Sequence, residues 1–456
     1  MARCFCRWRV MLICMCMPCI LLVLLVAYAN VMLCAVMYKT VELPSLHFVA
    51  PGTLNNKSFG PLPQTFWDFG QHGDAIWNRL QLTVDRYFNP ILRPNDTRAG
   101  LENGTIHESP TEAGVLTKLD SVGENLHQLP QQIQDFVKHM HRRDYPTLIQ
   151  PDGVCGAGEK DEREAPLLLL AIKSTELGFK NRQAIRQTWG RAGWVAGQGG
   201  SATGGGGGGG YIRRVFLLGN AVGDSSESLQ MESKHHGDIL QLDFRDTFFN
   251  LTLKDVLFWS WFSRSCNRTV FVLKGDDDVF VNTPKMITYL QDQLRKPQAH
   301  KIIEDFMIGD VIIAALPSQE RKSKYFIPGS FYKGIYPVYA GGGGVVYSGL
   351  LTRRLHHMSK RVHLFPIDDV YVGMCMTRLN VQLVHHPAFL TFGFPTETEE
   401  KQPCSYHTIL LVHKRSPSQL VKLWAEMKMT QAQCRDATLR KCETFTTKTF
   451  RPSKVC

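Results

Sequence analysis

Short apolar runs alternate with helix-like segments through the middle of the chain. The strand-like runs cover residues 166–172, 214–218 and 239–243, and the helix-like segments cover residues 181–189, 225–235 and 251–262. In the last segment Leu253, Leu257 and Trp261 recur on one helical face, as in a helix that packs against a core. Alternating strands and helices predict an α/β fold in which helices cover both faces of a mainly parallel sheet.

The N-terminal apolar stretch has a different pattern. No charged residue occurs between Val10 and Tyr38, and this length can cross the ~30 Å hydrocarbon core of a bilayer as a helix. Three arginines precede the stretch, so the positive-inside tendency predicts a cytosolic tail at 1–9 and a transmembrane signal-anchor at 10–38. A cleaved signal peptide is the alternative. The stretch is longer than the hydrophobic region of most signal peptides, and no small-residue cleavage site ends it.

The region after the anchor is divided into two parts. Residues 39–150 are interpreted as a lumenal stem with some helix, because periodicity is weak until apolar residues recur at helical spacing at Leu126, Ile133 and Phe136. Residues 151–456 contain the alternating strands and helices and are interpreted as the main globular domain. The chain is therefore predicted to be a single-pass type II membrane protein.

Composition agrees with a globular domain in the secretory lumen. Apolar residues make up 44% of the chain, enough for at least one large core. A net charge of +11 would suit nucleic acid, but the sequence has no zinc-finger spacing and no long basic block, so we predict no nucleic-acid partner. Five Asn-x-Ser/Thr triplets are candidate glycosylation sites: Asn56, Asn95, Asn103, Asn250 and Asn267.

Cysteine usage points to the same compartment. Of the 13 cysteines, seven follow the anchor and none of them forms a Cys-x-x-Cys pair, which favours disulfides over a metal site. They are Cys155, Cys266, Cys375, Cys404, Cys434, Cys442 and Cys456. An odd number leaves one cysteine free or linked to another chain. The pairing itself does not follow from the sequence.

A glycine tract interrupts the predicted domain between residues 198 and 210. It ends in an unbroken row of glycines and lacks the Gly-Lys-Ser/Thr of a phosphate-binding loop. We interpret it as a flexible insertion and expect it to be disordered.

Three consecutive carboxylates, Asp276, Asp277 and Asp278, interrupt the strand-like sequence 271–282. Like charges this close repel one another, and a bound cation is the usual remedy. Carboxylate oxygens favour Mg²⁺ or Mn²⁺, and such ions often complete their shell with substrate phosphate. A solvated acidic turn is the alternative, but β-rich sequence lies on both sides and the spacing does not match a calcium-binding loop.

Three further features are candidates for the same site. Four glycines, including Gly342 and Gly343, lie between β-rich flanks and permit close approach of the backbone to a ligand. Asp368 and Asp369 begin an apolar helix, where one aspartate would suffice as a cap and the other is available for chemistry. His413 ends an apolar run, a position where histidine is more often structural than a ligand.

Five segments resemble, in order, the motifs of the β-1,3-glycosyltransferases, which are inverting enzymes with a GT-A fold. The segments are 180–190, 242–254, 274–281, 339–344 and 366–373. The forms Phe248-Phe-Asn-Leu-Thr-Leu-Lys254 and Ile367-Asp-Asp-Val370 are most similar to the β-1,3-N-acetylglucosaminyltransferase branch. The resemblance covers about residues 150–430 and implies that residues 151–456 form a catalytic domain of the GT-A type.

The resemblance implies a role for each candidate residue. Asp278 is expected to bind Mn²⁺ directly, with Mg²⁺ as the alternative ion, together with Asp276 and His413. Asp369 is the better candidate for the catalytic base, and Asp368 is a cap or an alternative base. The donor nucleotide sugar is expected to contact seven residues: Arg182, Arg186, Lys274, Asp276, Asp277, Gly342 and Gly343.

The resemblance also implies the reaction. The chain is expected to transfer N-acetylglucosamine from UDP-GlcNAc in β-1,3 linkage to a galactose-terminated glycoprotein or glycolipid, including poly-N-acetyllactosamine, at the Golgi membrane. A β-1,3-galactosyltransferase using UDP-Gal is one alternative, and a non-catalytic anchored lectin-like protein is another. The exact acceptor stays open, as does assembly into a homo-oligomer.

Overall fold

The structure is a computed structural model that describes residues 25, 28, 74–88, 126–153, 155–156, 165–198, 208–221, 227–266 and 268–441. The chain divides into two compact units, Met1–Ser45 and Leu46–Cys456. The predicted anchor at 10–38 lies outside the described residues apart from Leu25 and Tyr28, and it stays a prediction. Within the described residues, no helix combines the length and apolar character needed to cross a membrane.

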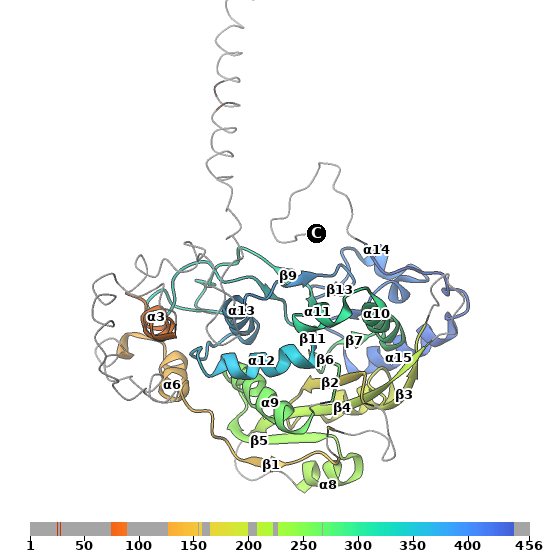
Figure 1. Cartoon of the computed structure of the whole chain (residues 1–456), viewed down its shortest axis with the longest axis horizontal. Helices are drawn as coiled ribbons and strands as arrows, with labels where there is room; N and C mark the ends of the chain where they lie inside the picture. Colours follow the sequence, from red (N-terminus) through yellow and green to blue (C-terminus); the bar gives the residue numbers. More distant parts are fainter. Residues whose placement is uncertain are drawn as a thin grey trace, which may run out of the picture. The chain divides into compact units, whose positions relative to one another are not determined.

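The second unit is built on a nine-stranded sheet. Its main path has the order β1-β5-β4-β2-β6-β11-β8-β12, and β3 pairs with β4 outside that path. Figure 1 shows β1, β5, β4, β2, β6 and β11 following one another upward from the bottom of the view. The strands are β1 (Thr147–Ile149), β2 (Leu168–Lys173), β3 (Gly193–Ala196), β4 (Gly209–Asn220), β5 (Ile239–Arg245), β6 (Phe271–Asp276), β8 (Met307–Gly309), β11 (Gly344–Ser348) and β12 (Val384–His385).

The sheet is mixed, not mainly parallel as the sequence predicted. Strands β5, β4, β2 and β6 are parallel to one another, whereas β11 is antiparallel to both β6 and β8. The outer strands β1 and β3 are also antiparallel to their partners. The alternating strand and helix pattern covers only the parallel part, so the antiparallel half had no comparable signal.

Helices cover both faces of the sheet, as the sequence predicted. They are α3 (Ile76–Phe88), α6 (Gln131–His139), α7 (Phe179–Gln187), α8 (Glu227–His236), α9 (Leu251–Ser265), α10 (Thr283–Arg295), α11 (Ala299–Glu304), α12 (Gly349–Ser359), α13 (Asp368–Leu379), α14 (Glu397–Glu400) and α15 (Pro417–Met429). Short 3₁₀ turns lie at Leu126–Gln128, Phe248–Asn250 and Ser405–His407.

Alternate residues of the buried strands contribute to two separate cores. On β2, Leu169 and Ala171 pack with α9, α12 and α13, whereas Leu168, Leu170 and Ile172 pack with α7, α10 and α15. This division follows from the two-residue period of a strand, whose side chains point alternately to opposite faces. A strand buried on both faces therefore reads as a continuous apolar run, which is what residues 166–172 showed.

Two small sheets lie beside the large one. Strands β13 (Phe389–Leu390), β14 (Leu411–Val412) and β7 (Phe280–Val281) form one, and β9 (Val311–Ile312) pairs with β10 (Tyr339–Ala340) in the other. Strand β14 is antiparallel to β7, with Val412 opposite Phe280. This pairing brings the residue after β14 close to the residues before β7, although they are far apart in the sequence.

Part of the segment predicted as stem is integrated into the core. Trp77 of α3 is fully buried, and its indole N–H donates to the carbonyl oxygen of Leu364 (3.0 Å). Asp85 of α3 forms a buried ion pair with Arg378 of α13 (2.6 Å). Helix α6 contributes Ile133 and Phe136 to the same core. These two helices therefore stabilise the domain itself.

The end of the glycine tract is ordered, contrary to the expectation of disorder. Gly209 and Gly210 begin β4 and pair with Ala196 and Val195 of β3. A Cβ on Gly209 would lie 2.6 Å from the ring of Trp194, so the strand requires glycine there. The preceding residues, 199–207, lie outside the described part of the chain.

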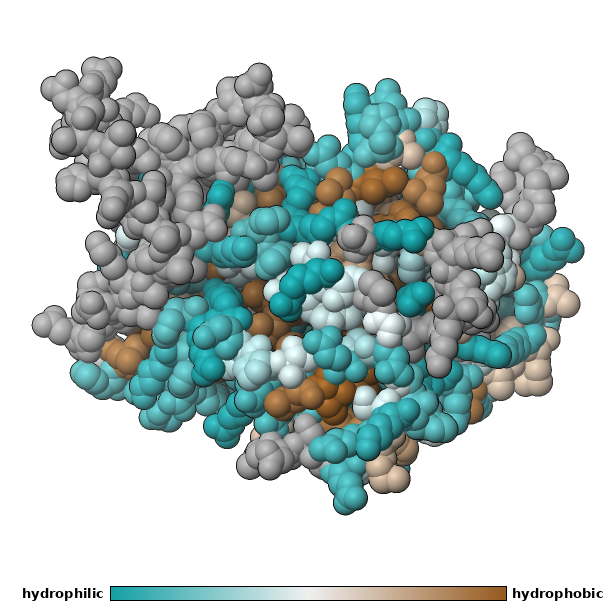
Figure 2. Space-filling model, turned by 60° about the horizontal axis from the view of Figure 1, so that its bottom comes forward, coloured by the Kyte–Doolittle hydropathy of each residue, from teal (hydrophilic) through white to brown (hydrophobic). Residues whose placement is uncertain are grey.

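Four cysteines form two disulfides, Cys155–Cys266 and Cys404–Cys434. Cys375 is buried and free, and Cys442 and Cys456 lie outside the described residues. On the face drawn in Figure 2, hydrophilic residues predominate and hydrophobic residues gather in a few separate patches.

Candidate active site

A cleft of about 480 Å³ lies where β2 and β6 end side by side. Lys173, the last residue of β2, is opposite Asp276, the last residue of β6. The loop after β6 supplies Asp277 and Asp278, and the start of α13 supplies Asp368 and Asp369. The carboxyl ends of adjacent parallel strands are the expected place for a ligand in an α/β fold, and the site has that position.

Asp276, Asp278 and His413 form a cluster with the donor atoms of a metal site. One ligand atom from each lies within 4.8 Å of the others. The His413 Nε2 is 3.1 Å from Asp278 Oδ1 and 3.8 Å from Asp276 Oδ2. Burial lowers the pKa of His413, but the hydrogen bond and charge of Asp278 outweigh it and raise the pKa above its ordinary value. The pairing of β14 with β7 thus brings His413 to the acidic triplet.

Asp277 is bound by other residues of the protein and is not part of this cluster. Its Oδ2 accepts a hydrogen bond from Ser174 Oγ (2.6 Å), and its Oδ1 accepts one from Asn181 Nδ2 (3.2 Å). Burial and the neighbouring aspartates raise its pKa to about 6, although the bond from Ser174 acts in the opposite direction. The three aspartates are therefore distinguished by their surroundings, with Asp276 and Asp278 facing His413.

Asp368 is a buried partner of lysines. It forms an ion pair with Lys173 and lies 3.8 Å from Lys274 Nζ. Burial alone would raise the pKa of Asp368, but the two lysines outweigh it and hold the pKa well below its usual range. Lys274 is fully enclosed and bonds Asp255 (2.6 Å). Asp368 thus stays ionised, and its charge is balanced by the two lysines.

Asp369 has the opposite character. Its carboxylate is partly exposed to the cleft and lies 3.9 Å from Lys274 Nζ. Burial and the charge of Asp368 raise its pKa, so Asp369 takes up a proton far more readily than an ordinary aspartate. Two adjacent carboxyls with pKa values moved apart are a recurring arrangement in acid–base sites.

The glycine segment separates the two sides of this site. A Cβ on Gly342 would lie 2.8 Å from Asp369 Oδ2. Gly343 has φ +113°, and a Cβ there would lie 3.0 Å from the Cβ of His413. Its carbonyl oxygen accepts a hydrogen bond from the backbone N–H of Asp276 (3.2 Å). Glycine is required at 343 by backbone angle and at both positions by space.

Comparison with known proteins identifies the family. The galactosyltransferase family profile matches residues 180–387. Human N-acetyllactosaminide β-1,3-N-acetylglucosaminyltransferase 2 is 40% identical over 379 residues, which cover 81% of this chain and 89% of that protein. The chain belongs to the β-1,3-glycosyltransferase family. The assignment predicted from the sequence motifs is confirmed, and the chain is an enzyme of this family.

Other members of the β-1,3-glycosyltransferase family match at similar levels. Mouse N-acetyllactosaminide β-1,3-N-acetylglucosaminyltransferase 4 is 39% identical over 67% of this chain and 81% of its own length. Rat UDP-GlcNAc:βGal β-1,3-N-acetylglucosaminyltransferase 7 is 38% identical over 70% and 79%. The solved apo structure of the bifunctional glycosyltransferase WbbM aligns over 61% of this chain and 53% of that one, with 10% identity and a TM-score of 0.32, too low to support an argument.

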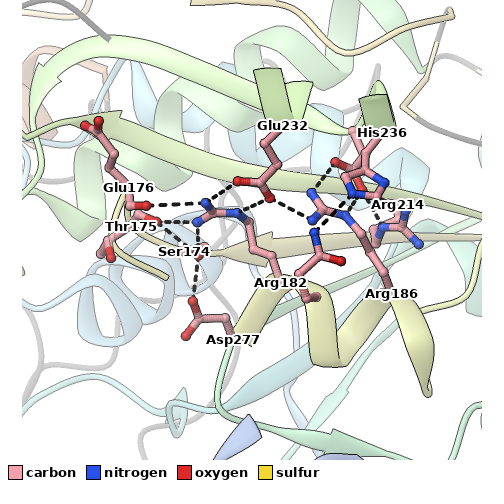
Figure 3. A network of polar contacts seen from close by, with 11 residues as sticks. Ser174, Thr175, Glu176, Arg182, Arg186, Arg214, Glu232, His236 and Asp277 are labelled. Atoms are coloured by element: carbon pink, nitrogen blue, oxygen red, sulfur yellow. Dashed lines mark hydrogen bonds and ion pairs between the residues drawn. The ribbon is translucent and has the colours of Figure 1, made fainter. Parts of the chain in front are cut away.

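The two arginines that the family motif places at the nucleotide are engaged inside the protein. Arg182 pairs with Glu232 (2.6 Å), and Arg186 pairs with Glu232 and Asp238 (both 2.7 Å). Neither is among the residues that line the cleft. Figure 3 shows Arg182 between Glu232 on one side and Ser174 and Thr175 on the other. Direct contact with a nucleotide would require these ion pairs to open.

The arginines nevertheless connect to the cleft. Arg182 Nη1 donates to Ser174 Oγ (3.1 Å), and Ser174 in turn donates to Asp277 (2.6 Å). Glu232 lies on α8, so a buried polar network runs from that helix to the acidic triplet (Figure 3). Lys274 likewise lies behind Asp368 and Asp369 instead of lining the cleft.

Sequence reasoning missed several residues of the site. Lys173 ends the buried strand β2 and Ser174 directly follows it, and their polar character at a strand end was an available signal. Lys254 is buried in α9 and bonds Asp246 (2.9 Å) and the carbonyl oxygen of Ser174 (2.7 Å). Tyr325 lines the cleft from a loop that has no sequence pattern of its own.

Proposed function

We propose that this chain is a metal-dependent, inverting GT-A-type enzyme that transfers N-acetylglucosamine from UDP-GlcNAc in β-1,3 linkage to a galactose-terminated glycan. The relatives named above carry this donor or linkage in their names. The observation that carries the proposal is the juxtaposition, in one cleft, of the cluster Asp276, Asp278 and His413 with the base candidate Asp369.

The residues present fit a divalent cation such as Mn²⁺, with Mg²⁺ as the alternative. Two carboxylates and an imidazole nitrogen supply three donors, and the bare backbone of Gly343 leaves room for His413 beside them. A cation bound there would neutralise the negative charge that develops on the departing diphosphate. Asp277 would stay with Ser174 and Asn181, where it fixes the loop that presents its two neighbours.

Asp369 is proposed as the general base. It faces the cleft, and its raised pKa suits it to accept the proton of the attacking galactose hydroxyl. The charges of Asp368 and Lys274 set the electrostatic environment of Asp369, while Lys173 balances the charge of Asp368. Attack on the face opposite the leaving diphosphate inverts the anomeric centre from α to β. A glycosidase would instead need a protonated carboxyl beside the scissile bond.

The membrane context is part of the proposal. The apolar stretch at 10–38 would anchor the chain as a type II protein of the Golgi membrane, with the catalytic domain in the lumen. The acceptor would then be a galactose-terminated glycoprotein or glycolipid in the same compartment.

The test is a donor screen with the full chain in detergent, with a β-galactoside acceptor and Mn²⁺. We expect rapid consumption of UDP-GlcNAc and a β-1,3-linked product. Preferred consumption of UDP-Gal would instead identify a β-1,3-galactosyltransferase. Binding of Mn²⁺ measured by calorimetry in the presence of UDP should be lost in Asp278→Ala and His413→Ala, and unchanged binding would contradict the metal site.

Asp369→Asn separates the base from the rest of the site. We expect donor binding to persist while kcat falls by about 10²–10⁴-fold, the usual contribution of general base catalysis. Asp292→Asn on α10 is the matched control, because that carboxylate is exposed and does not line the cleft. A kcat within threefold of the parent enzyme would remove Asp369 from the base role.

A further inference from the structure

A second cavity, of about 850 Å³, adjoins the active-site cleft. The end of β5 and the turn after it form one wall, α6 contributes another, and the loop at 321–324 completes it. Phe248 and Lys324 line both this cavity and the cleft that contains Asp369. The two cavities therefore meet at these two side chains.

Aromatic side chains lead from the cleft into this cavity. Tyr325 lines the cleft and packs edge-to-face against Phe248, with ring centroids 5.3 Å apart. Phe248 in turn contacts Phe249, which lines only the second cavity, at 5.9 Å. Lys324 Nζ lies 4.9 Å from the Phe248 ring. A run of aromatic rings beside polar groups is a surface suited to an elongated ligand with apolar ring faces, such as an oligosaccharide.

The charged side chains that line this second cavity are mostly basic. Five Lys and Arg side chains line the cavity against two Asp. Among the residues that the structure describes, the exposed side chains of Arg245, Arg321 and Lys322 form no ion pair. Asp243 accepts a hydrogen bond from Asn220 (3.1 Å), and Asp135 accepts one from Gln131 (2.8 Å), so neither acid is directed to these cations. A neutral sugar chain would not require three uncompensated cations.

We propose that this cavity is an acceptor subsite that binds an anionic substituent, a sulfate ester or a carboxylate, on the sugars behind the acceptor galactose. The inference rests on the proposed function, because the acceptor hydroxyl must reach Asp369 while the rest of the glycan leaves the cleft. Leaving past Tyr325 and Phe248 places the next sugars beside Arg321 and Lys322. The Arg321 guanidinium offers paired N–H donors that match sulfate and carboxylate oxygens.

The test compares kcat/KM for three galactose-terminated oligosaccharides of the same length, one neutral, one with a sulfate ester on the penultimate sugar and one with a carboxylate there. We expect the anionic acceptors to be preferred about tenfold at low salt, since each exposed ion pair contributes a factor of about two to five. The preference should shrink at high ionic strength because these charges are exposed. Preference for both anions identifies charge as the recognised feature, and preference for only one identifies that group.

The double variant Arg321→Gln/Lys322→Gln should reduce this ratio to about two or less. The matched control Lys301→Gln/Lys422→Gln removes the same charge from α11 and α15, outside both cavities, and should keep the parent ratio. Equal kcat/KM for neutral and anionic acceptors would overturn the proposal, as would a preference that survives the Arg321/Lys322 change. Absence of transfer to all acceptors would instead refute the proposed function.

Discussion

Replacing Glu232 by Gln should destabilise the enzyme strongly, although the residue lies outside the cleft. Glu232 pairs with Arg182 (2.6 Å) and Arg186 (2.7 Å), and its side chain is only 3% exposed. Arg186 would keep its second partner, Asp238. Arg182, 1% exposed, forms an ion pair only with Glu232 among the described residues, so the variant would leave one buried cation without a carboxylate.

The expected loss in the free energy of unfolding follows from leaving one buried arginine without its carboxylate. Removing one partner of a buried ion pair costs about 3–5 kcal/mol, because the remaining charge is neither solvated nor neutralised. Gln has the shape of Glu and retains one carbonyl acceptor, so we expect the lower end, about 3 kcal/mol. We also expect weaker donor binding, because Arg182 supports Ser174, which holds Asp277.

The assay is urea unfolding followed by the fluorescence of the buried residues Trp189 and Trp259. A lower midpoint with an unchanged slope reports lost stability. Glu227→Gln is the matched control, since Glu227 lies in the first turn of the same helix but is exposed, and should cost at most about 1 kcal/mol. A loss of less than 1 kcal/mol in Glu232→Gln would refute the reasoning, because it would mean that Arg182 does not depend on this carboxylate.

Two further predictions concern the base and the boundary of the domain. Because burial and Asp368 raise the pKa of Asp369 to about 7, kcat/KM for the acceptor should fall as the pH drops through about 7 and the base becomes protonated. A bound cation would lower this midpoint, and a pH profile with saturating donor and Mn²⁺ that stays flat down to about pH 5 would contradict the assignment. Deleting the chain up to residue 90 removes α3, and with it buried Trp77 and the Asp85–Arg378 pair, so it should lower the melting temperature severely relative to a chain that starts at residue 46. Equal melting temperatures for the two chains would show that α3 does not stabilise the domain.

The sequence was most informative where one local pattern decides the structure. The buried run before Lys173 and the helix at 251–262 were recognisable from their periods, and β2 and α9 occupy those places. Prediction from the sequence failed where contacts between distant segments determine the structure. The antiparallel strand β11 follows a glycine row, and its placement between β6 and β8 depends on pairing that no local period records.

The same limit applies to the site. The acidic triplet and the Asp368–Asp369 pair were visible as local sequence, yet their different roles depend on Lys173 and Lys274 from other strands. Helix α3 was hidden in a segment of weak periodicity, because its burial depends on Leu364 and Arg378 far along the chain. For Arg182 the motif predicted a nucleotide contact, which stays a prediction, whereas its ion pair with Glu232 and its hydrogen bond to Ser174 had no local signal.

Gly342 and Gly343 are positions from which the two parts of the proposed transfer reaction can be perturbed separately. A methyl group added at 342 would press on Oδ2 of Asp369, the proposed base, whereas one added at 343 would press on His413, the proposed metal ligand, and strain the chain at φ +113°. Alanine at 342 should thus affect activation of the acceptor hydroxyl, whereas alanine at 343 should affect departure of the nucleotide.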